Sequence, residues 1–259
     1  MSEEYATFKS YIKQKFDIDL SLYKEAQMKR RLTSLRNRRG FKNFIDYYKA
    51  LESDEALANE FMDRITINVS EFYRNPKRWE ILQKVIFPRF IHKKRNITIW
   101  SAGCSTGEEP YSLALLLKEY FPNLAADIIA TDIDNNVLKK AQQGRYQKQA
   151  LKNLSDYLKK KYFVYEDGFF QIDASLQNMI TFKKHNLLAD AFPNRIDLIV
   201  CRNVLIYFTD EAKSIIYQHL SEALNPNGIL FVGSTEQIFN PQQYGLSLVD
   251  TFFYQKNAY

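Results

Sequence analysis

Residues 97–120 carry the pattern that most constrains the fold: an apolar run, a loop with two glycines and a helix follow in direct succession. Ile97-Thr-Ile-Trp100 is typical of a β-strand, and Pro110 stands where a helix can begin after the loop at 101–109. Glycines let the backbone approach a ligand without a Cβ in the way, and the first turn of a helix offers free N–H groups. The segment predicts a ligand site beyond the carboxyl end of a strand.

The alternation of strand and helix continues along the rest of the chain. Apolar runs at 128–132, 196–201 and 229–233 predict three further strands, with helices at 135–141 and 210–224. Such alternation is typical of a parallel sheet with right-handed crossovers. The tail at 246–256 predicts one or two closing strands. We therefore expect an α/β fold.

Residues 143–185 interrupt this rhythm. After a mostly helical stretch to residue 162, β-type runs occur at 163–165, 169–172 and 179–183, with a turn at Glu166-Asp-Gly168. We interpret these three runs as a small antiparallel β insert.

The first part of the chain is helical in pattern. Apolar residues recur every four positions over 5–16, and a second helix carries Met28, Leu32 and Leu35 on one face before Gly40 ends it. Two shorter helices are expected at 41–51 and 56–67. We predict an N-terminal helical domain over residues 1–72 and a second domain over 73–259 that includes the β insert at about 143–185.

Positive charge is concentrated in the first third of the chain. The net charge of the whole chain is +6, yet residues 1–95 hold 21 Lys and Arg against 13 Asp and Glu, a net charge of +8. Much of it lies on the second helix, which is either a solvated charged face or a docking surface for an acidic partner. A nucleic-acid partner fits the charge, but the aromatic interleaving and target-base motifs of such proteins are missing.

Cysteines and histidines give no sign of a metal centre. Two cysteines, Cys104 and Cys201, cannot form a disulfide framework or a four-cysteine site, and the three histidines have no ligand spacing. We expect both cysteines to be small buried residues. No signal peptide is visible, and no apolar run approaches the roughly 18 residues needed to span a bilayer. We therefore expect a reduced cytoplasmic protein.

The glycine loop differs from the known phosphate-binding loops. Its spacing is not G-x-G-x-x-G, and Glu108-Glu109 stands where a phosphate would sit. Two acids suit a cationic ligand such as S-adenosylmethionine; the alternative is an ordinary strand-to-helix turn. Asp132 ends the next strand, where an acid commonly accepts hydrogen bonds from two ribose hydroxyls. It could instead cap the following helix, as could Asp134.

Two further segments place polar residues near this expected site. Cys201-Arg-Asn-Val-Leu-Ile-Tyr207 follows a strand and lacks the Pro-containing motifs of enzymes that methylate bases. The junction segment at 66–74 carries Asn68, Ser70 and Arg74. It is either a helix-capping region with a solvated arginine or a lid over the ligand.

Together these segments resemble the CheR family of chemotaxis receptor glutamate methyltransferases, in the form found in Bacillus-like bacteria. The resemblance covers nearly the whole chain. It rests on Lys24-Glu-Ala-Gln-Met-Lys-Arg-Arg-Leu32, Asn68-Val-Ser-Glu-Phe-Tyr-Arg74, Trp100-Ser-Ala-Gly-Cys-Ser-Thr-Gly-Glu-Glu-Pro-Tyr-Ser112, Ala130-Thr-Asp-Ile-Asp134, His185-Asn-Leu-Leu188, Cys201-Arg-Asn-Val-Leu-Ile-Tyr207 and Phe231-Val-Gly-Ser-Thr-Glu236.

The resemblance implies a class I S-adenosylmethionine-dependent methyltransferase fold, Rossmann-like, with a mostly parallel sheet and a closing antiparallel strand. It implies Arg74 and Tyr207 as catalytic residues and the basic second helix, through Lys29, Arg31 and Arg38, as the receptor-docking surface. The implied cofactor-binding residues are Asn68 and Ser70 of the linker, Arg74, Gly103, Glu109, Asp132 for the ribose, Asn186 and Leu187 beside the adenine, and Arg202 and Asn203.

The implied reaction is methyl transfer from S-adenosylmethionine to a glutamate side chain, which yields a methyl ester and S-adenosylhomocysteine. A glutamate with a pKa near 4.3 is already ionised at neutral pH, so no general base is required. The expected partners are the cytoplasmic methylation helices of chemoreceptors, to which a monomeric cytoplasmic enzyme would be recruited through protein contacts. The alternative is a signalling module that binds S-adenosylmethionine without transferring its methyl group.

Two departures from the family pattern stand out. Gly103 lies where some relatives have alanine, and we expect that exchange to be harmless. The insert turn at Glu166-Asp-Gly168 is shorter than in relatives that dock a receptor C-terminal pentapeptide, which argues against such tethering here.

Overall fold

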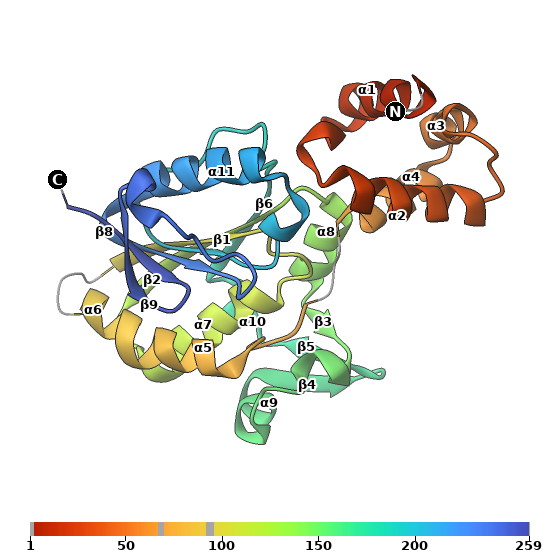
Figure 1. Ribbon diagram of the computed structural model, residues 1–259. Helices are drawn as coiled ribbons and strands as arrows, with labels where there is room; N and C mark the ends of the chain where they lie inside the picture. The colour runs from red at the N-terminus through yellow and green to blue at the C-terminus, as the bar shows by residue number, and fades with distance from the viewer. Residues whose placement is uncertain (1–2, 67–69, 92–95, 259) are drawn as a thin grey trace.

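A seven-stranded sheet forms the centre of the computed structural model, which describes residues 3–66, 70–91 and 96–258 (Figure 1). Neighbouring strands are parallel from β6 to β8, and β10 runs antiparallel to both β8 and β9. This confirms the predicted mostly parallel sheet with antiparallel closure. The strand order is β6 (Ile180–Lys184), β2 (Ala125–Asp132), β1 (Asn96–Ala102), β7 (Ile196–Cys201), β8 (Leu224–Val232), β10 (Phe253–Lys256) and β9 (Leu246–Asp250).

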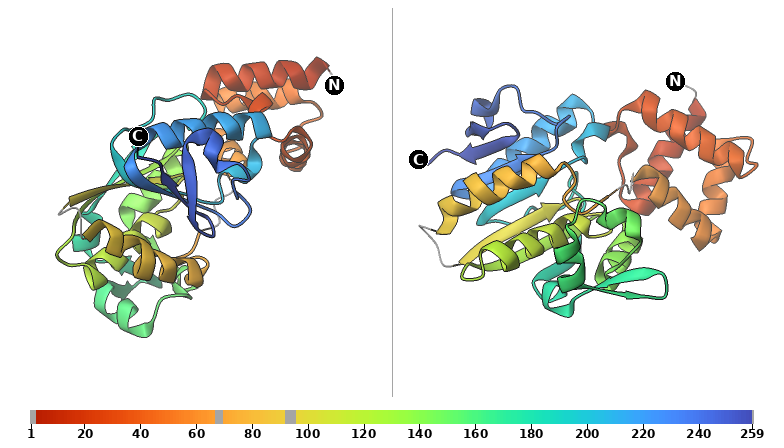
Figure 2. Two further views of the ribbon diagram at one scale, coloured as in Figure 1. Left: turned by 60° about the vertical axis from the view of Figure 1, so that its left-hand side comes forward. Right: turned by 90° about the horizontal axis from the view of Figure 1, so that it is seen from below.

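Helices cover both faces of the sheet (Figures 1 and 2). Side chains alternate along β7, so that Leu198 and Val200 join the core under one helical layer while Ile199 and Cys201 join the core under the other. The first layer consists of α5 (Pro76–Ile81), α6 (Phe87–Ile91) and α7 (Glu108–Tyr120), and the second contains α11 (Asp210–Ala223). Burial on both faces explains why the β7 sequence is apolar along nearly its whole length.

The remaining body helices lie at the edges of these layers. The helix α8 (Asn135–Gln143) contacts β2 and β6, and the short α10 (Ala174–Gln177) contacts α7. None of the helices within the described ranges is long and apolar enough to cross a membrane.

Within the described residues 3–66 the N-terminal region forms four α-helices, as predicted: α1 (Glu3–Phe16), α2 (Glu25–Arg38), α3 (Phe44–Ser53) and α4 (Glu55–Ile65). Their core is aromatic, and the Phe8 ring lies 4.7 Å from Phe44 and 6.2 Å from Phe61 between centroids. Side chains of Asn43 and Asp54 cap α3 and α4 by accepting backbone N–H bonds.

Main-chain hydrogen bonds fix this helical region against the carboxyl ends of the strands. Thr209 donates its N–H to the Leu22 carbonyl, and Lys24 donates its N–H to the Tyr207 carbonyl, both at 2.9 Å. The side-chain amide of Asn186 donates to the Asp17 carbonyl at 2.7 Å. The helical region therefore forms one wall of whatever site lies beyond those strand ends.

A small antiparallel sheet confirms the predicted β insert but has different members from those expected. The strand order in this sheet is β3 (Arg145–Tyr146), β5 (Phe169–Ile172) and β4 (Phe163–Glu166). The helix α9 (Asp156–Tyr162) lies between β3 and β4 in the chain. Asp167 and Gly168 form the two-residue turn between β4 and β5, with φ of 49° and 80°, as Asp-Gly favours in hairpins.

The run at 179–183 was wrongly predicted to belong to this small sheet. It forms β6, which pairs in parallel with β2 at the edge of the main sheet. Its alternate apolar residues Ile180 and Phe182 pack against Ala130 and Leu138 of the body, where their apolar surface is removed from water. The domain boundary between residues 72 and 73 stays a prediction.

Candidate active site

A cavity of about 1140 Å³, part of it open to solvent, lies where the strand ends meet the helical region. Asn68 lies outside the described residues. Every other residue predicted for the cofactor or for catalysis lines this cavity: Ser70, Arg74, Gly103, Glu109, Asp132, Asn186, Leu187, Arg202, Asn203 and Tyr207.

The loop between β1 and α7 depends on glycine at a tight position. Gly103 has a φ of +80°, and a Cβ placed on it would lie 2.4 Å from Val204 Cγ2. An L-residue is strained at this φ, and the close approach of Val204 leaves no room for a methyl group. This geometry agrees with the expectation that glycine in place of the relatives' alanine is harmless, whereas alanine would be strained in this chain.

Asp132 joins the two loops that follow β1 and β2. Its Oδ2 accepts the Ser105 N–H at 2.8 Å, and its Oδ1 accepts the Asp134 N–H at 3.1 Å. The capping role belongs to Asp134, whose side chain accepts the Asn136 N–H at 2.8 Å. Burial raises the pKa of Asp132 to about 6, although the backbone N–H groups oppose that rise. Asp132 thus presents a buried carboxylate at the cavity wall.

The two neighbouring glutamates that begin α7 have different environments. Glu109 lines the cavity, whereas Glu108 is buried outside it and accepts a hydrogen bond from the Thr106 hydroxyl at 2.7 Å. Glu109 accepts a hydrogen bond from the Ser101 hydroxyl at 2.8 Å and lies 3.6 Å from Arg202. Burial raises the pKa of Glu109 to about 7, against the opposing effects of Arg202 and Ser101. Only one of the two acids can act on a ligand.

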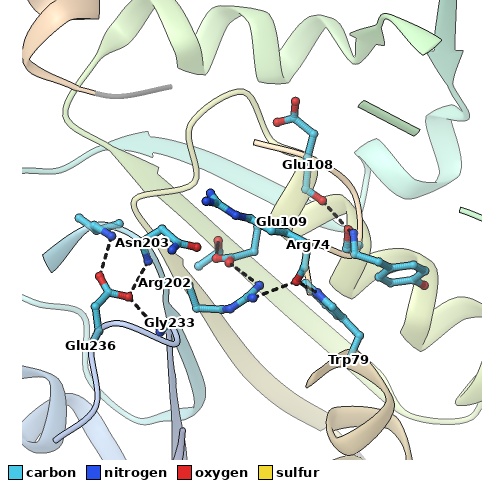
Figure 3. A network of polar contacts seen from close by, with 12 residues as sticks. Arg74, Trp79, Glu108, Glu109, Arg202, Asn203, Gly233 and Glu236 are labelled. Carbon is cyan, nitrogen blue, oxygen red and sulfur yellow. Dashed lines mark hydrogen bonds and ion pairs between the residues drawn. The ribbon is translucent and has the colours of Figure 1, made fainter. Parts of the chain in front are cut away.

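Arg202 holds the linker at Arg74 (Figure 3). Its Nη2 donates to the Arg74 carbonyl at 2.9 Å, and the same carbonyl accepts the Trp79 indole N–H at 3.0 Å. The side chain of Arg202 is 2% exposed, and its guanidinium lies 4.6 Å from the centroid of the Phe231 ring. Its Nε has no acceptor among the described residues. An arginine buried in this way can offer that N–H to a ligand carboxylate.

Tyr207 ends the loop after β7 and meets the helical region. The guanidinium of Arg31 lies 5.3 Å from the centroid of the Tyr207 ring and also donates to the carbonyls of Arg64 and Ile65, at 3.4 and 3.2 Å. Arg31, predicted as a receptor contact, is therefore tied to the cavity wall. A tyrosine phenol is neutral at physiological pH, and burial raises the pKa of Tyr207 further.

The other two predicted docking residues lie away from the cavity. Lys29 is half-buried with its Nζ 5.2 Å from the centroid of the Tyr5 ring. Arg38 pairs with Glu60 at 2.7 Å, yet its side chain is 61% exposed. The basic helix α2 is thus partly neutralised within its own domain, and its exposed charge is smaller than its composition suggests.

Asn186 and Leu187 have different contacts at the cavity. The amide of Asn186 donates to the Asp17 carbonyl and accepts the Leu188 N–H at 3.0 Å, so both of its polar ends are engaged. Leu187 is 9% exposed and offers an apolar surface to the cavity. Asn186 therefore joins the body to the helical region, and Leu187 can flank a ligand.

Sequence reasoning missed the contribution of the helical region to the cavity. Tyr23, Ile65 and Thr66 line it from that side, and Trp79 and His185 line it from the body. The motif that begins at Lys24 gave an indirect signal, because Tyr23 immediately precedes it. The predicted burial of both cysteines is confirmed: Cys104 is 1% and Cys201 0% exposed.

The fold and the cavity define a methyltransferase that binds S-adenosylmethionine, and comparison with known proteins agrees. The family model described as "CheR methyltransferase, SAM binding domain" matches residues 68–252, and "CheR methyltransferase, all-alpha domain" matches residues 3–66. The chain belongs to the CheR methyltransferase family, and S-adenosylmethionine is its cofactor.

Several chemotaxis protein methyltransferases resemble this chain in sequence over most of their length. A chemotaxis protein methyltransferase of Listeria monocytogenes is 42% identical over 99% of this chain and 98% of its own length. Proteins of the same description are 39% identical in Borreliella burgdorferi, over 86% of this chain and 84% of the relative, and 34% identical in Escherichia coli, over 80% and 73%.

Proposed function

We propose that this chain methylates the γ-carboxylate of glutamate side chains on the cytoplasmic helices of chemoreceptors. The product would be a glutamate methyl ester, with release of S-adenosylhomocysteine. The observation that carries the proposal is the convergence on one cavity of all the described residues predicted for the cofactor and for catalysis, with an arginine and a tyrosine beside the acids. The relatives' description as chemotaxis protein methyltransferases supports the receptor substrate.

The residues of the cavity fit S-adenosylmethionine, which supplies an activated methyl group when bound. Asp132 has lone pairs left on both carboxylate oxygens for the ribose hydroxyls. Glu109 is a titratable acid on the cavity wall, and its ionised carboxylate would attract a cationic ligand. Leu187 provides an apolar side for the adenine, and Arg202 Nε is a donor for the ligand carboxylate.

Arg74 and Tyr207 are the proposed groups for the receptor glutamate. An arginine can hold a carboxylate through two parallel hydrogen bonds, and Arg74 lies on the cavity wall. The neutral phenol of Tyr207 can orient the reacting groups. Because the attacking carboxylate is already ionised, these residues act by alignment and by exclusion of water rather than by removing a proton.

The helix α2 is the proposed docking surface. Its exposed Arg38 lies at one end, and Arg31, closer to the amino terminus of the helix, contacts Tyr207. A receptor helix with acidic residues that lay along α2 would therefore be led toward the cavity. Complementary charge of this kind raises the encounter rate and fixes the register.

The proposal is tested by transfer of tritiated methyl groups to membranes that contain receptors. Wild-type protein should release volatile label from the product after alkali treatment, as a methyl ester requires. Arg74→Ala should lower turnover by about 100-fold or more, also when the cofactor is saturating. Arg78→Ala is the matched control, because Arg78 lies 4.6 Å from the Phe252 ring and outside the cavity.

Binding without transfer would instead identify a module that senses S-adenosylmethionine. In that case calorimetry would detect the cofactor complex, and the receptor membranes would stay unlabelled. No feature of the described residues favours this second function.

A further inference from the structure

The segment Phe231-Val-Gly-Ser-Thr-Glu236 has no role in the reaction as described so far. Glu236 follows β8, is 3% exposed and does not line the cavity. A buried glutamate is costly unless hydrogen bonds compensate for the lost water. Its position beside the loop that follows β7 indicates what it does.

The carboxylate of Glu236 accepts four backbone N–H groups, and Figure 3 shows it beside Asn203 and Gly233, two of the donors. Oε1 accepts those of Val204 at 2.8 Å and Leu205 at 2.6 Å, and Oε2 accepts those of Asn203 at 2.6 Å and Gly233 at 2.9 Å. Three of these donors are consecutive residues of the loop after β7. One side chain therefore holds most of that loop's backbone.

The loop needs such an external clamp. Asn203 has a φ of +61°, in a region that L-residues seldom adopt without support. A carboxylate can accept all four bonds, whereas an amide of the same shape would turn its NH₂ toward two of the donors. The Tyr217 hydroxyl donates to the Glu236 carbonyl at 3.0 Å, which anchors the clamp to α11.

Gly233 and Glu236 form a matched pair. A Cβ on residue 233 would lie 2.2 Å from Glu236 Oε2. The glycine is therefore required for the carboxylate to reach its donors. This explains why the two residues occur at this spacing within one motif.

We propose that Glu236 is a positioning residue that presents Arg202, Asn203 and Tyr207 to the cofactor and the substrate. The inference rests on the roles proposed above for those three residues. All three belong to the clamped loop or flank it directly, and Arg202 in turn fixes the linker at Arg74. Displacing this loop therefore disturbs both sides of the cavity.

The test compares Glu236→Gln with Asp197→Asn. Asp197 is the matched control, because it is a buried carboxylate at the far end of β7 that accepts hydrogen bonds from Thr98 N–H at 3.0 Å and Asn225 Nδ2 at 2.7 Å. Three measurements are made on each purified full-length chain: S-adenosylhomocysteine affinity by calorimetry, melting temperature, and hydrogen exchange in residues 201–207.

Glu236→Gln should weaken S-adenosylhomocysteine binding by about tenfold or more and accelerate exchange in residues 201–207. Asp197→Asn should lower the melting temperature by at least as much as Glu236→Gln does. Its affinity for S-adenosylhomocysteine and its exchange in residues 201–207 should stay unchanged. Unchanged affinity in Glu236→Gln, or an equal loss of affinity in both variants, would overturn the proposal. Because the ligand is the cofactor product, these results do not depend on the identity of the methylated protein.

Glu236→Asp keeps the charge but withdraws the carboxylate by one methylene group. The same three measurements are made on Glu236→Asp if the glutamine variant does not fold. Faster exchange confined to residues 201–207, with weaker binding, supports the clamp. Wild-type exchange and affinity in this variant would contradict it.

Discussion

Two adjacent glutamates show how environment assigns roles at the scale of single residues. Glu108 and Glu109 share the first turn of α7, but one is held by Thr106 and the other faces the cavity. Sequence identifies the acidic pair, and only the packing of the first helical turn decides which acid meets the ligand. The cavity acids Glu109 and Asp132 are both harder to ionise than ordinary carboxyls because they are buried.

Binding of S-adenosylmethionine should therefore depend on pH. Glu109 has a pKa of about 7 and Asp132 of about 6, so both gain charge as the pH rises from 5 to 8. Because S-adenosylmethionine is cationic, it favours the ionised form of both acids. The affinity for S-adenosylmethionine should therefore rise from pH 5 to pH 8, and its binding below pH 7 should release protons. As the pH is lowered below the pKa of such an acid, the affinity for S-adenosylmethionine should fall by up to about tenfold per pH unit. Calorimetry in two buffers of different ionisation enthalpy measures both effects.

The variant Glu109→Gln assigns the upper part of this pH dependence. It should bind S-adenosylmethionine more weakly at pH 8, and its affinity should no longer change between pH 7 and 8. A variant with the wild-type pH profile would show that Glu109 does not face the cationic ligand.

The glycine loop provides a second prediction at this scale. Gly103→Ala should lower the free energy of unfolding by about 1–2 kcal/mol from the positive φ alone, with a further loss from the Val204 contact. Urea denaturation of this variant and of Gly103→Ala combined with Val204→Ala separates the two terms. The double variant should recover only the steric part. Wild-type stability in the single variant would contradict this account of the loop.

At the scale of elements, the sequence predicts most strands and helices but not all of their partners. Alternation of apolar runs and amphipathic segments was sufficient for β1, β2, β7 and β8. The run that forms β6 was misassigned because an apolar β-type run does not show which strand it will pair with. Its partner is decided by Ala130 and Leu138, which are distant in sequence.

The helix α2 carries an exposed arginine, Arg38, and an arginine at the cavity wall, Arg31. Variants of the two distinguish a role in docking from a role in catalysis. Arg38→Glu should slow receptor methylation by about tenfold at low salt, and the difference should shrink at high salt because exposed charges are screened. Arg31→Ala should lower turnover at every salt concentration, because Arg31 contacts Tyr207. Initial rates over a salt series measure both.

Charge reversal at Lys84 is the control for the docking prediction. Lys84 is 68% exposed, and its only ion pair among the described residues is with Glu80 on its own helical turn. Its reversal should leave the salt dependence of methylation unchanged. Equal slowing by Lys84→Glu and Arg38→Glu would indicate a general charge effect and remove the docking role of α2.

At the scale of the whole molecule, the helical region and the body share one buried cluster. Phe8 and Phe61 of the N-terminal core belong to the same cluster as Leu205 and Ile216 of the body, and Tyr23 packs edge-on against Phe208 at 4.9 Å. The charge imbalance between the two parts therefore does not mean that they are independent units. The cavity needs both, since Tyr23 and Ile65 line it.

Unfolding should accordingly be a single cooperative transition. Both tryptophans of the chain, Trp79 and Trp100, lie in the body, while far-UV circular dichroism also reports the N-terminal helices. Urea titrations followed by the two signals should coincide. A loss of helical signal before any change in fluorescence would show that the helical region unfolds separately.

The candidate site was predictable where a strand end or a motif marks a residue. Asp132, Arg202 and Tyr207 were found in this way. Tyr23 and Trp79 were missed because tertiary packing, rather than a local pattern, brings them to the cavity. Glu236 was visible in a motif, but its function emerged only from the four N–H groups around it.

The central claim is that this cavity transfers a methyl group to glutamate side chains of a receptor. The most direct measurement is mass spectrometry of receptor peptides after incubation with S-adenosylmethionine and either wild-type or Arg74→Ala protein. The account predicts one added CH₂ on specific glutamates, removed by alkali, in the wild-type reaction and almost none with Arg74→Ala. A methyl group on any other side chain, or equal modification by both proteins, would contradict it.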